Sequence, residues 1–123
     1  MRKILLVEDD IMSRDLLARR LRSRGFEVVI AGDGERALEL ARESGPNLIV
    51  MDMSLPVKDG WNTVRELKSR DGTKHIPIIA LTGYNRIGDR EQALQAGCTE
   101  FESKPVSFKR LIAKIGDILG FPE

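Results

Sequence analysis

Short apolar segments alternate with longer polar segments of helical periodicity along the chain, and this alternation limits the folds open to it. Five segments have the length of a strand. The first four are apolar runs, several of them apolar at every position, as strands buried on both faces are. The five segments are Ile4 to Val7, Phe26 to Ala31, Leu48 to Met51, Ile76 to Leu81 and Thr99 to Glu102. Strict alternation of strands and helices is typical of a parallel sheet with helices on both faces. We therefore expect an α/β fold of the (βα)₅ type.

The segments between these strands carry the signals of helices. Asp33 is suited to cap a helix N-terminus, and Gly45 followed by Pro46 is suited to end that helix. The expected helices contain Leu17 with Leu21, Ala37 with Leu38 and Ala41, Trp61 with Val64 and Leu67, Ile87 to Ala96, and Phe108 to Leu119. Each expected strand is therefore followed by one helix.

The composition favours one soluble domain with local rather than global electrostatics. The 123 residues, 41% of them hydrophobic and 32% charged, suffice for one core, so we expect a single domain over residues 1–123 and no output domain. A formal net charge of +1 gives no general attraction to nucleic acid or to an anionic membrane. The single cysteine, Cys98, excludes an internal disulfide, and the chain lacks a signal peptide or a membrane-length apolar run. We expect a cytoplasmic protein.

Arginines are frequent in the first expected helix, at positions 14, 19, 20, 22 and 24. They occur around the helix with Asp15 among them, and no helix-turn-helix pattern follows. We interpret them as a solvated face and expect no nucleic-acid partner.

Polar side chains follow four of the expected strands. The ligand site of an open parallel sheet lies beyond the carboxyl ends of its strands, where these side chains would meet. They are Glu8, Asp9 and Asp10, then Asp52, then Thr82, then Lys104. Several carboxylates in one crevice require a bound cation or a protonated group, and oxygen ligands favour Mg²⁺. Lys104 is suited to an anionic group beside the metal, of which phosphate fits best, whereas Asp10 is suited to cap the next helix.

The residues at these strand ends resemble the receiver domain of two-component response regulators. The motifs that carry the resemblance are Ile4 to Asp10, Val50 to Pro56 with Gly60, Ile79 to Gly83, and Phe101 to Pro105. They occur in the order and at the spacing of that family, over essentially the whole chain. The resemblance implies a flavodoxin-like, doubly wound parallel sheet with strand order 2-1-3-4-5.

The resemblance also implies a role for each of these residues. Asp52 matches the phosphoacceptor, and the implied Mg²⁺ ligands are Glu8, Asp9, Asp52 and the main-chain carbonyl of Ser54. Thr82 and Lys104 match the residues that bind the phosphoryl oxygens, and Phe101 matches an aromatic switch position. Pro105 matches a proline that follows a cis bond. Two residues depart from the commoner pattern, because Glu8 replaces an Asp and Phe101 replaces a Tyr that carries a hydroxyl.

The function implied is that of a phosphoacceptor switch in two-component or phosphorelay signalling. A histidine kinase or histidine phosphotransfer protein would donate the phosphoryl group to Asp52 in a Mg²⁺-dependent reaction. Phosphorylation would then alter one face of the domain, and this face would regulate a downstream protein. The face is formed by residues 87–96, 99–102 and 108–119. Such a chain is not an enzyme in the ordinary sense, although it catalyses its own phosphorylation and dephosphorylation. The small Ser54 and the bulky Tyr84 beside the site predict slow dephosphorylation.

Other interpretations were weighed against this one. A phosphatase of the haloacid dehalogenase type needs a second acid where this chain has Ser54, and the Gly32 to Ala37 motif of dinucleotide-binding proteins is explained by a capped helix start. A receiver that docks without phosphorylation and a receiver from a hybrid histidine kinase remain alternatives. The complete set of Asp52, Thr82 and Lys104 with both acids argues against the former.

Overall fold

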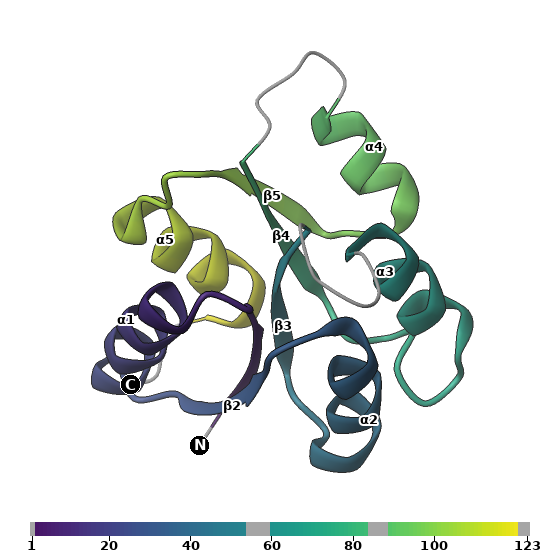
Figure 1. Cartoon of the computed structure of the whole chain (residues 1–123), viewed down its shortest axis with the longest axis horizontal. Coiled ribbons are helices and arrows are strands. Elements are labelled where there is room, and N and C mark those ends of the chain that lie inside the picture. Colours follow the sequence, from purple (N-terminus) through teal and green to yellow (C-terminus); the bar gives the residue numbers. More distant parts are fainter. Residues whose placement is uncertain (1, 54–59, 84–88, 121–123) are drawn as a thin grey trace.

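Five parallel strands form one sheet in the order β2-β1-β3-β4-β5, which confirms the predicted flavodoxin-like topology (Figure 1). The computed structural model describes residues 2–53, 60–83 and 89–120. The elements, in chain order, are β1 Lys3–Val7, α1 Ile11–Ser23, β2 Glu27–Ala31, α2 Gly34–Ser44, β3 Leu48–Asp52, α3 Gly60–Ser69, β4 Ile78–Thr82, α4 Asp89–Ala96, β5 Glu100–Ser103 and α5 Phe108–Leu119. Within the described ranges, no helix is long and apolar enough to cross a membrane.

The helices cover both faces of the sheet, with α1 and α5 on one face and α2, α3 and α4 on the other (Figure 1). Two cores result, one containing Leu6, Leu21 and Ile115 and the other containing Met51 and Leu67. Every position of β3 and of β4 is buried. These strands are therefore apolar until their last residue, because a side chain on either face meets a helix layer and gains about 1.5–3 kcal/mol on full burial.

Four of the five expected strand starts are wrong by one or two residues. β1 begins at Lys3 instead of Ile4, β5 begins at Glu100 instead of Thr99, and β2 and β4 begin later than expected. β2 begins at Glu27 instead of Phe26, and β4 begins at Ile78 instead of Ile76. The Phe26 N–H donates to the Leu21 carbonyl at 3.3 Å, and the Ile76 N–H donates to the Thr73 carbonyl at 3.0 Å. Both residues lie in turns with buried side chains, so their apolar character reports burial in the core and not membership of a strand.

The predicted ends of α2 are confirmed by its capping. The Asp33 side chain accepts a hydrogen bond from the Arg36 N–H at 2.9 Å, and Gly45 ends the helix with a left-handed φ of 59°. In the described part of the chain α4 begins at Asp89, so the predicted start at Ile87 lies outside the described residues.

Candidate functional site

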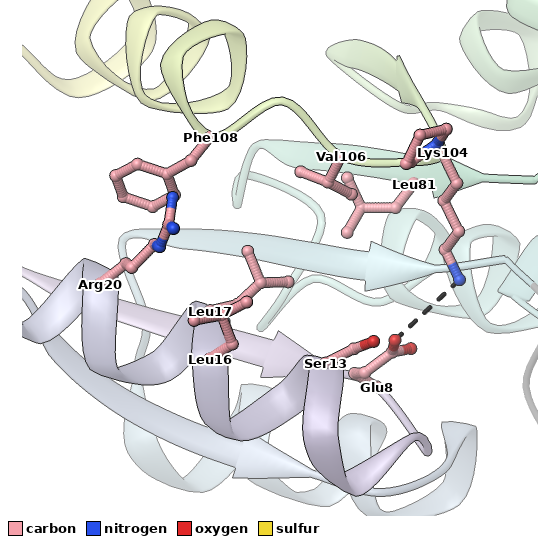
Figure 2. Close-up of a pocket in the computed structure, with 10 residues that line it drawn as sticks. Glu8, Ser13, Leu16, Leu17, Arg20, Leu81, Lys104, Val106 and Phe108 are labelled. Atoms are coloured by element: carbon pink, nitrogen blue, oxygen red, sulfur yellow. Dashed lines mark ion pairs between the residues drawn. The ribbon is translucent and has the colours of Figure 1, made fainter.

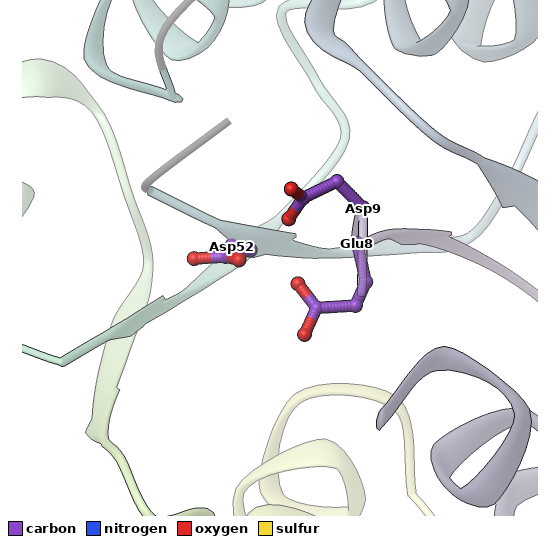
Figure 3. A group of neighbouring side chains, drawn as sticks. All are labelled: Glu8, Asp9 and Asp52. Carbon is purple, nitrogen blue, oxygen red and sulfur yellow. The ribbon is translucent and has the colours of Figure 1, made fainter. Parts of the chain in front are cut away.

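Three carboxylates meet at the carboxyl ends of β1 and β3. Val7 pairs with Met51 in the parallel register, so the residues that follow them, Glu8 and Asp52, reach the same edge of the sheet. Oxygen atoms of Glu8, Asp9 and Asp52 all lie within 4.8 Å of one another, and Figure 3 shows both acids of the β1 end reaching toward Asp52. Glu8 and Asp52 are each only 2% exposed, whereas Asp9 is exposed. The sequence predicted this acidic cluster correctly.

Within the cluster, the ionised form of Glu8 is disfavoured, and its pKa is raised. Burial raises the pKa of Glu8 from 4.5 to about 8, with further contributions from its hydrogen bond to Asp52 and from the charge of Asp52. The second carboxylate oxygen of Glu8, Oε2, is buried and has no hydrogen-bond partner. An oxygen in that position either carries a proton or faces a cation, so the donor set fits a hard divalent ion.

Lys104 supplies a positive charge from the loop after β5. Its ammonium nitrogen lies 3.0 Å from Asp52 Oδ2 and 4.0 Å from Glu8 Oε1, and Figure 2 shows the side chain extended toward Glu8. The Lys104 N–H donates to the Thr82 carbonyl at 2.7 Å, and the peptide bond to Pro105 is cis, as the resemblance implied. The loop thereby holds the ammonium group directly over the Asp52 carboxylate.

Thr82 and Phe101 occupy the neighbouring strands at the positions expected from their motifs. Thr82 is the last residue of β4 and is buried, and β4 pairs with β3 so that Leu81 lies opposite Asp52. Phe101 lies opposite Ala80 on β5 and packs, half-buried, against the core beneath α2, α3 and α4. The two residues thus lie two steps apart in the β4–β5 ladder.

Asp10 serves the backbone and not the acidic cluster. Its side chain accepts hydrogen bonds from the Ser13 N–H at 3.0 Å and from the Ser13 hydroxyl at 2.6 Å, which caps α1 as predicted. These hydrogen bonds lower the pKa of Asp10 below its ordinary value. Of the acidic run after β1, only Glu8 and Asp9 belong to the site.

Gly60, the first residue of α3, lies against the backbone of Met53, which follows Asp52. The Gly60 N–H donates to the Met53 carbonyl at 3.2 Å, and a Cβ at Gly60 would lie 2.5 Å from Met53 Cα. No side chain fits so close to a backbone atom, so glycine is required where α3 begins. Ser54 and Tyr84, to which the sequence assigned a metal-binding carbonyl and a shielding role, lie outside the described residues.

An apolar groove adjoins the acidic cluster. The groove has a volume of about 300 Å³ and runs between α1 and the start of α5 (Figure 2). Leu16, Leu17, Val106 and Phe108 form much of its wall, and Glu8 and Lys104 line it at the site. Beside it, Met12 at the start of α1 is 82% exposed. The periodicity of α1 did not reveal this surface, because the exposed apolar residues fall off the buried stripe of the helix.

The sequence interpretation also missed a buried ion cluster on β5. Glu102 is buried and contacts both Arg110 and Lys114 of α5. The sequence feature that could have indicated it is a glutamate in a short strand, with basic residues eight and twelve positions later on one helix.

Known proteins match this chain over nearly its full length. The family model of the response regulator receiver domain matches residues 4–116. The polar-differentiation response regulator DivK of Brucella anthropi is 38% identical over 119 residues, which are 97% of each chain.

Two solved structures share the fold and bear on the site. The receiver domain of the sensor histidine kinase PA1611 of Pseudomonas aeruginosa, described with a magnesium ion coordinated in its active-site cleft, is 36% identical with a TM-score of 0.88, over 97% of this chain and 98% of that one. The receiver domain of the Saccharomyces cerevisiae response regulator Ssk1, solved with the histidine phosphotransfer protein Ypd1, is 29% identical with a TM-score of 0.87, over 95% and 88%.

Proposed function

The chain belongs to the receiver domain family of two-component response regulators, and on that basis we propose that it is a switch in which Asp52 accepts a phosphoryl group. The observation that carries this proposal is the environment of the Asp52 carboxylate. It is buried at the end of β3, within 4.8 Å of two further acids and 3.0 Å from the Lys104 ammonium. A carboxylate so placed has a cation on one side and an acidic metal pocket on the other.

Glu8, Asp9 and Asp52 are the described residues that would hold Mg²⁺, with the Ser54 carbonyl proposed as a further ligand. The unpartnered Oε2 atom of Glu8 and the oxygen-only donor set fit this ion. When bound, Mg²⁺ would neutralise the negative charge that gathers between the acids and the phosphoryl oxygens.

The reaction proposed is in-line phosphoryl transfer from a phosphohistidine. An Asp52 oxygen forms the new bond to phosphorus as the phosphorus–nitrogen bond breaks, and the imidazole leaves with that electron pair. Lys104 pairs with one phosphoryl oxygen and the Thr82 hydroxyl donates to another, so both residues position the group and stabilise its charge. The chain thus catalyses its own modification, and its slow loss, without turning over a separate substrate.

The phosphodonor is proposed to dock on the α1 side of the site. Ile11, Met12 and Leu16 are large, exposed apolar residues of α1, and the groove beside them leads to Glu8 and Lys104. A helix carrying a phosphohistidine would cover this surface and reach Asp52. The Ypd1 complex of the related Ssk1 receiver supports a histidine phosphotransfer protein or a histidine kinase as the donor.

The output is proposed to be a change in the face formed by α4, β5 and α5. Movement of Thr82 toward a phosphoryl oxygen would open space that the half-buried Phe101 ring can fill, and a downstream protein would bind the altered face. A cytoplasmic location belongs to the proposal, supported by Cys98, which is a buried free thiol.

The test is incubation with a small-molecule phosphodonor and Mg²⁺, followed by intact-mass measurement. Wild type is expected to gain one phosphoryl group, and Asp52→Asn none, because an amide is not a nucleophile for phosphorus. Asp71→Asn, at an exposed aspartate just beyond the C-terminal end of α3, serves as the matched control and is expected to react like wild type. Equal phosphorylation of Asp52→Asn would reject the acceptor, and an unmodified wild type would favour a receiver that docks without phosphorylation.

A further inference from the structure

Glu102 is a buried carboxylate at a strand position that otherwise suits an apolar side chain. It is 3% exposed, and its partner across the β4–β5 ladder is the fully buried Leu81. A charge is tolerated in such a place only when it is paired and hydrogen-bonded. The groups that pair with Glu102 therefore show which elements the buried charge connects.

Both oxygens of the Glu102 carboxylate are bound by one helix. Arg110 Nε donates to Oε1 at 2.8 Å, and Lys114 Nζ donates to Oε2 at 2.7 Å. Arg110 and Lys114 are four residues apart, so they project from the same side of α5 toward β5. Although burial raises the pKa of Glu102, the hydrogen bonds and charges of Lys114 and Arg110 outweigh it and lower the pKa below its ordinary value.

Lys114 makes a second contact that the other basic residue does not share. Its ammonium group also donates a hydrogen bond to the main-chain carbonyl of Phe101. One ammonium thus joins the carboxylate of Glu102 to the backbone of the half-buried aromatic residue beside it. The same short strand leads directly to Lys104, which contacts Asp52.

We propose that Glu102, Arg110 and Lys114 form an ionic clamp through which the backbone at Phe101 sets the position of α5. The inference rests on the proposed phosphoacceptor function and adds to it the link between the site and the helix. The Glu102 carboxylate holds the Lys114 ammonium over the Phe101 carbonyl, so a shift of that carbonyl moves the ammonium and the helix that carries it. Apart from the clamp, α5 is held to the sheet by the apolar contacts of Leu111, Ile112 and Ile115, which have no fixed direction.

The clamp can be tested on the whole chain by amide chemical shifts, with Mg²⁺ and beryllofluoride added to mimic the phosphoryl group. The Met53 amide reports the site, because Met53 follows Asp52, and the amides from Leu111 to Ile118 report α5. Lys114→Met removes both bonds of the ammonium, and Glu102→Gln removes the charge that holds it. Lys109→Met, at an exposed lysine of the same helix, is the matched control.

We expect the Met53 response in all four proteins and a loss of about twofold or more in the α5 response of Lys114→Met and Glu102→Gln. Lys109→Met is expected to match wild type. An α5 response in either clamp variant equal to that of Lys109→Met overturns the clamp while leaving the acceptor site intact. Absence of the Met53 response in wild type overturns the acceptor site and the clamp with it.

Discussion

Glu8→Gln is predicted to stabilise the metal-free protein near neutral pH, although it removes a residue of the proposed metal site. In the folded protein Glu8 ionises only at a pKa of about 8, because it is buried beside Asp52, whereas its ordinary value is 4.5. Ionised Glu8 is therefore less favourable in the folded protein than in the unfolded chain. Glutamine has nearly the same shape and carries no charge to bury.

The size of the effect follows from proton linkage. Between pH 4.5 and about 8 the unfolded chain has released the Glu8 proton while the folded protein retains it. Across this window each pH unit lowers the free energy of unfolding by about 1.4 kcal/mol. The stability contributed by protonated Glu8 is thus full below pH 4.5 and is lost as the pH rises toward 8. Near pH 7 the loss amounts to about 3 kcal/mol, and near pH 5 to about 1 kcal/mol.

The assay is urea denaturation of wild type and Glu8→Gln in the presence of a chelator, at both of these pH values. We expect the variant to exceed wild type by about 3 kcal/mol near pH 7 and by about 1 kcal/mol near pH 5. Glu43→Gln makes the same chemical change at an exposed position of α2 and is expected to leave stability nearly unchanged. Saturating Mg²⁺ is expected to narrow the difference, because it binds the folded wild type more tightly than the variant.

The reasoning is refuted if the advantage of Glu8→Gln does not grow between the two pH values, or if Glu43→Gln shows the same gain. Either result would mean that Glu8 is not held protonated by its surroundings in the folded protein. The acidic cluster would then tolerate full ionisation without a cation.

Three other outcomes are expected. Mg²⁺ is predicted to quench the fluorescence of Trp61, which lies half-buried at the start of α3 just beyond the Asp52 loop; unchanged emission with binding confirmed by calorimetry would reject that placement. Lys104→Gln is predicted to slow phosphorylation by about a hundredfold in a phosphodonor time course, because the charge 3.0 Å from Asp52 is lost, while Mg²⁺ titrations show binding retained or strengthened. Gly60→Ala is predicted to destabilise the protein by about 1–3 kcal/mol in urea denaturation, since its Cβ would meet the Met53 backbone; an unchanged midpoint would show that the loop gives way freely.

The fold was largely predictable because the alternation of apolar and helical segments indicates both which strands are buried and that they are parallel. The apolar runs identified the first four strands, since the central strands lie between two helix layers and have no solvent-facing side. Four strand starts were wrong by one or two residues. At two of them the cause is that Phe26 and Ile76 are buried residues whose N–H groups bond to the preceding turns. Hydrophobicity reports whether a side chain is covered, whereas a strand boundary depends on backbone hydrogen bonds.

The grouping of the acidic residues was predictable for a related reason. Parallel strands end at one edge, so residues separated by more than forty positions, such as Glu8 and Asp52, meet without any local signal joining them. The sequence left open whether a bound cation or a retained proton relieves the repulsion between the carboxylates, because the answer depends on how deeply they are buried. Glu8 is only 2% exposed, and the Lys104 ammonium lies 4.0 Å from its carboxylate. In the metal-free protein the pKa of Glu8 is therefore raised, and Glu8 retains its proton.

The ion pairs of Glu102 could not be predicted from the sequence. A charged residue in a short edge strand is ordinarily solvated, and an amphipathic helix with lysine and arginine on its polar side is ordinarily a surface helix. Only the packing of α5 on β5 brings Arg110 and Lys114 within hydrogen-bond distance of the carboxylate. Lys104, which contacts the acidic cluster, and Phe101, whose carbonyl Lys114 binds, lie at the two ends of one segment of four residues. The link that we propose between the site and α5 would run along this short segment.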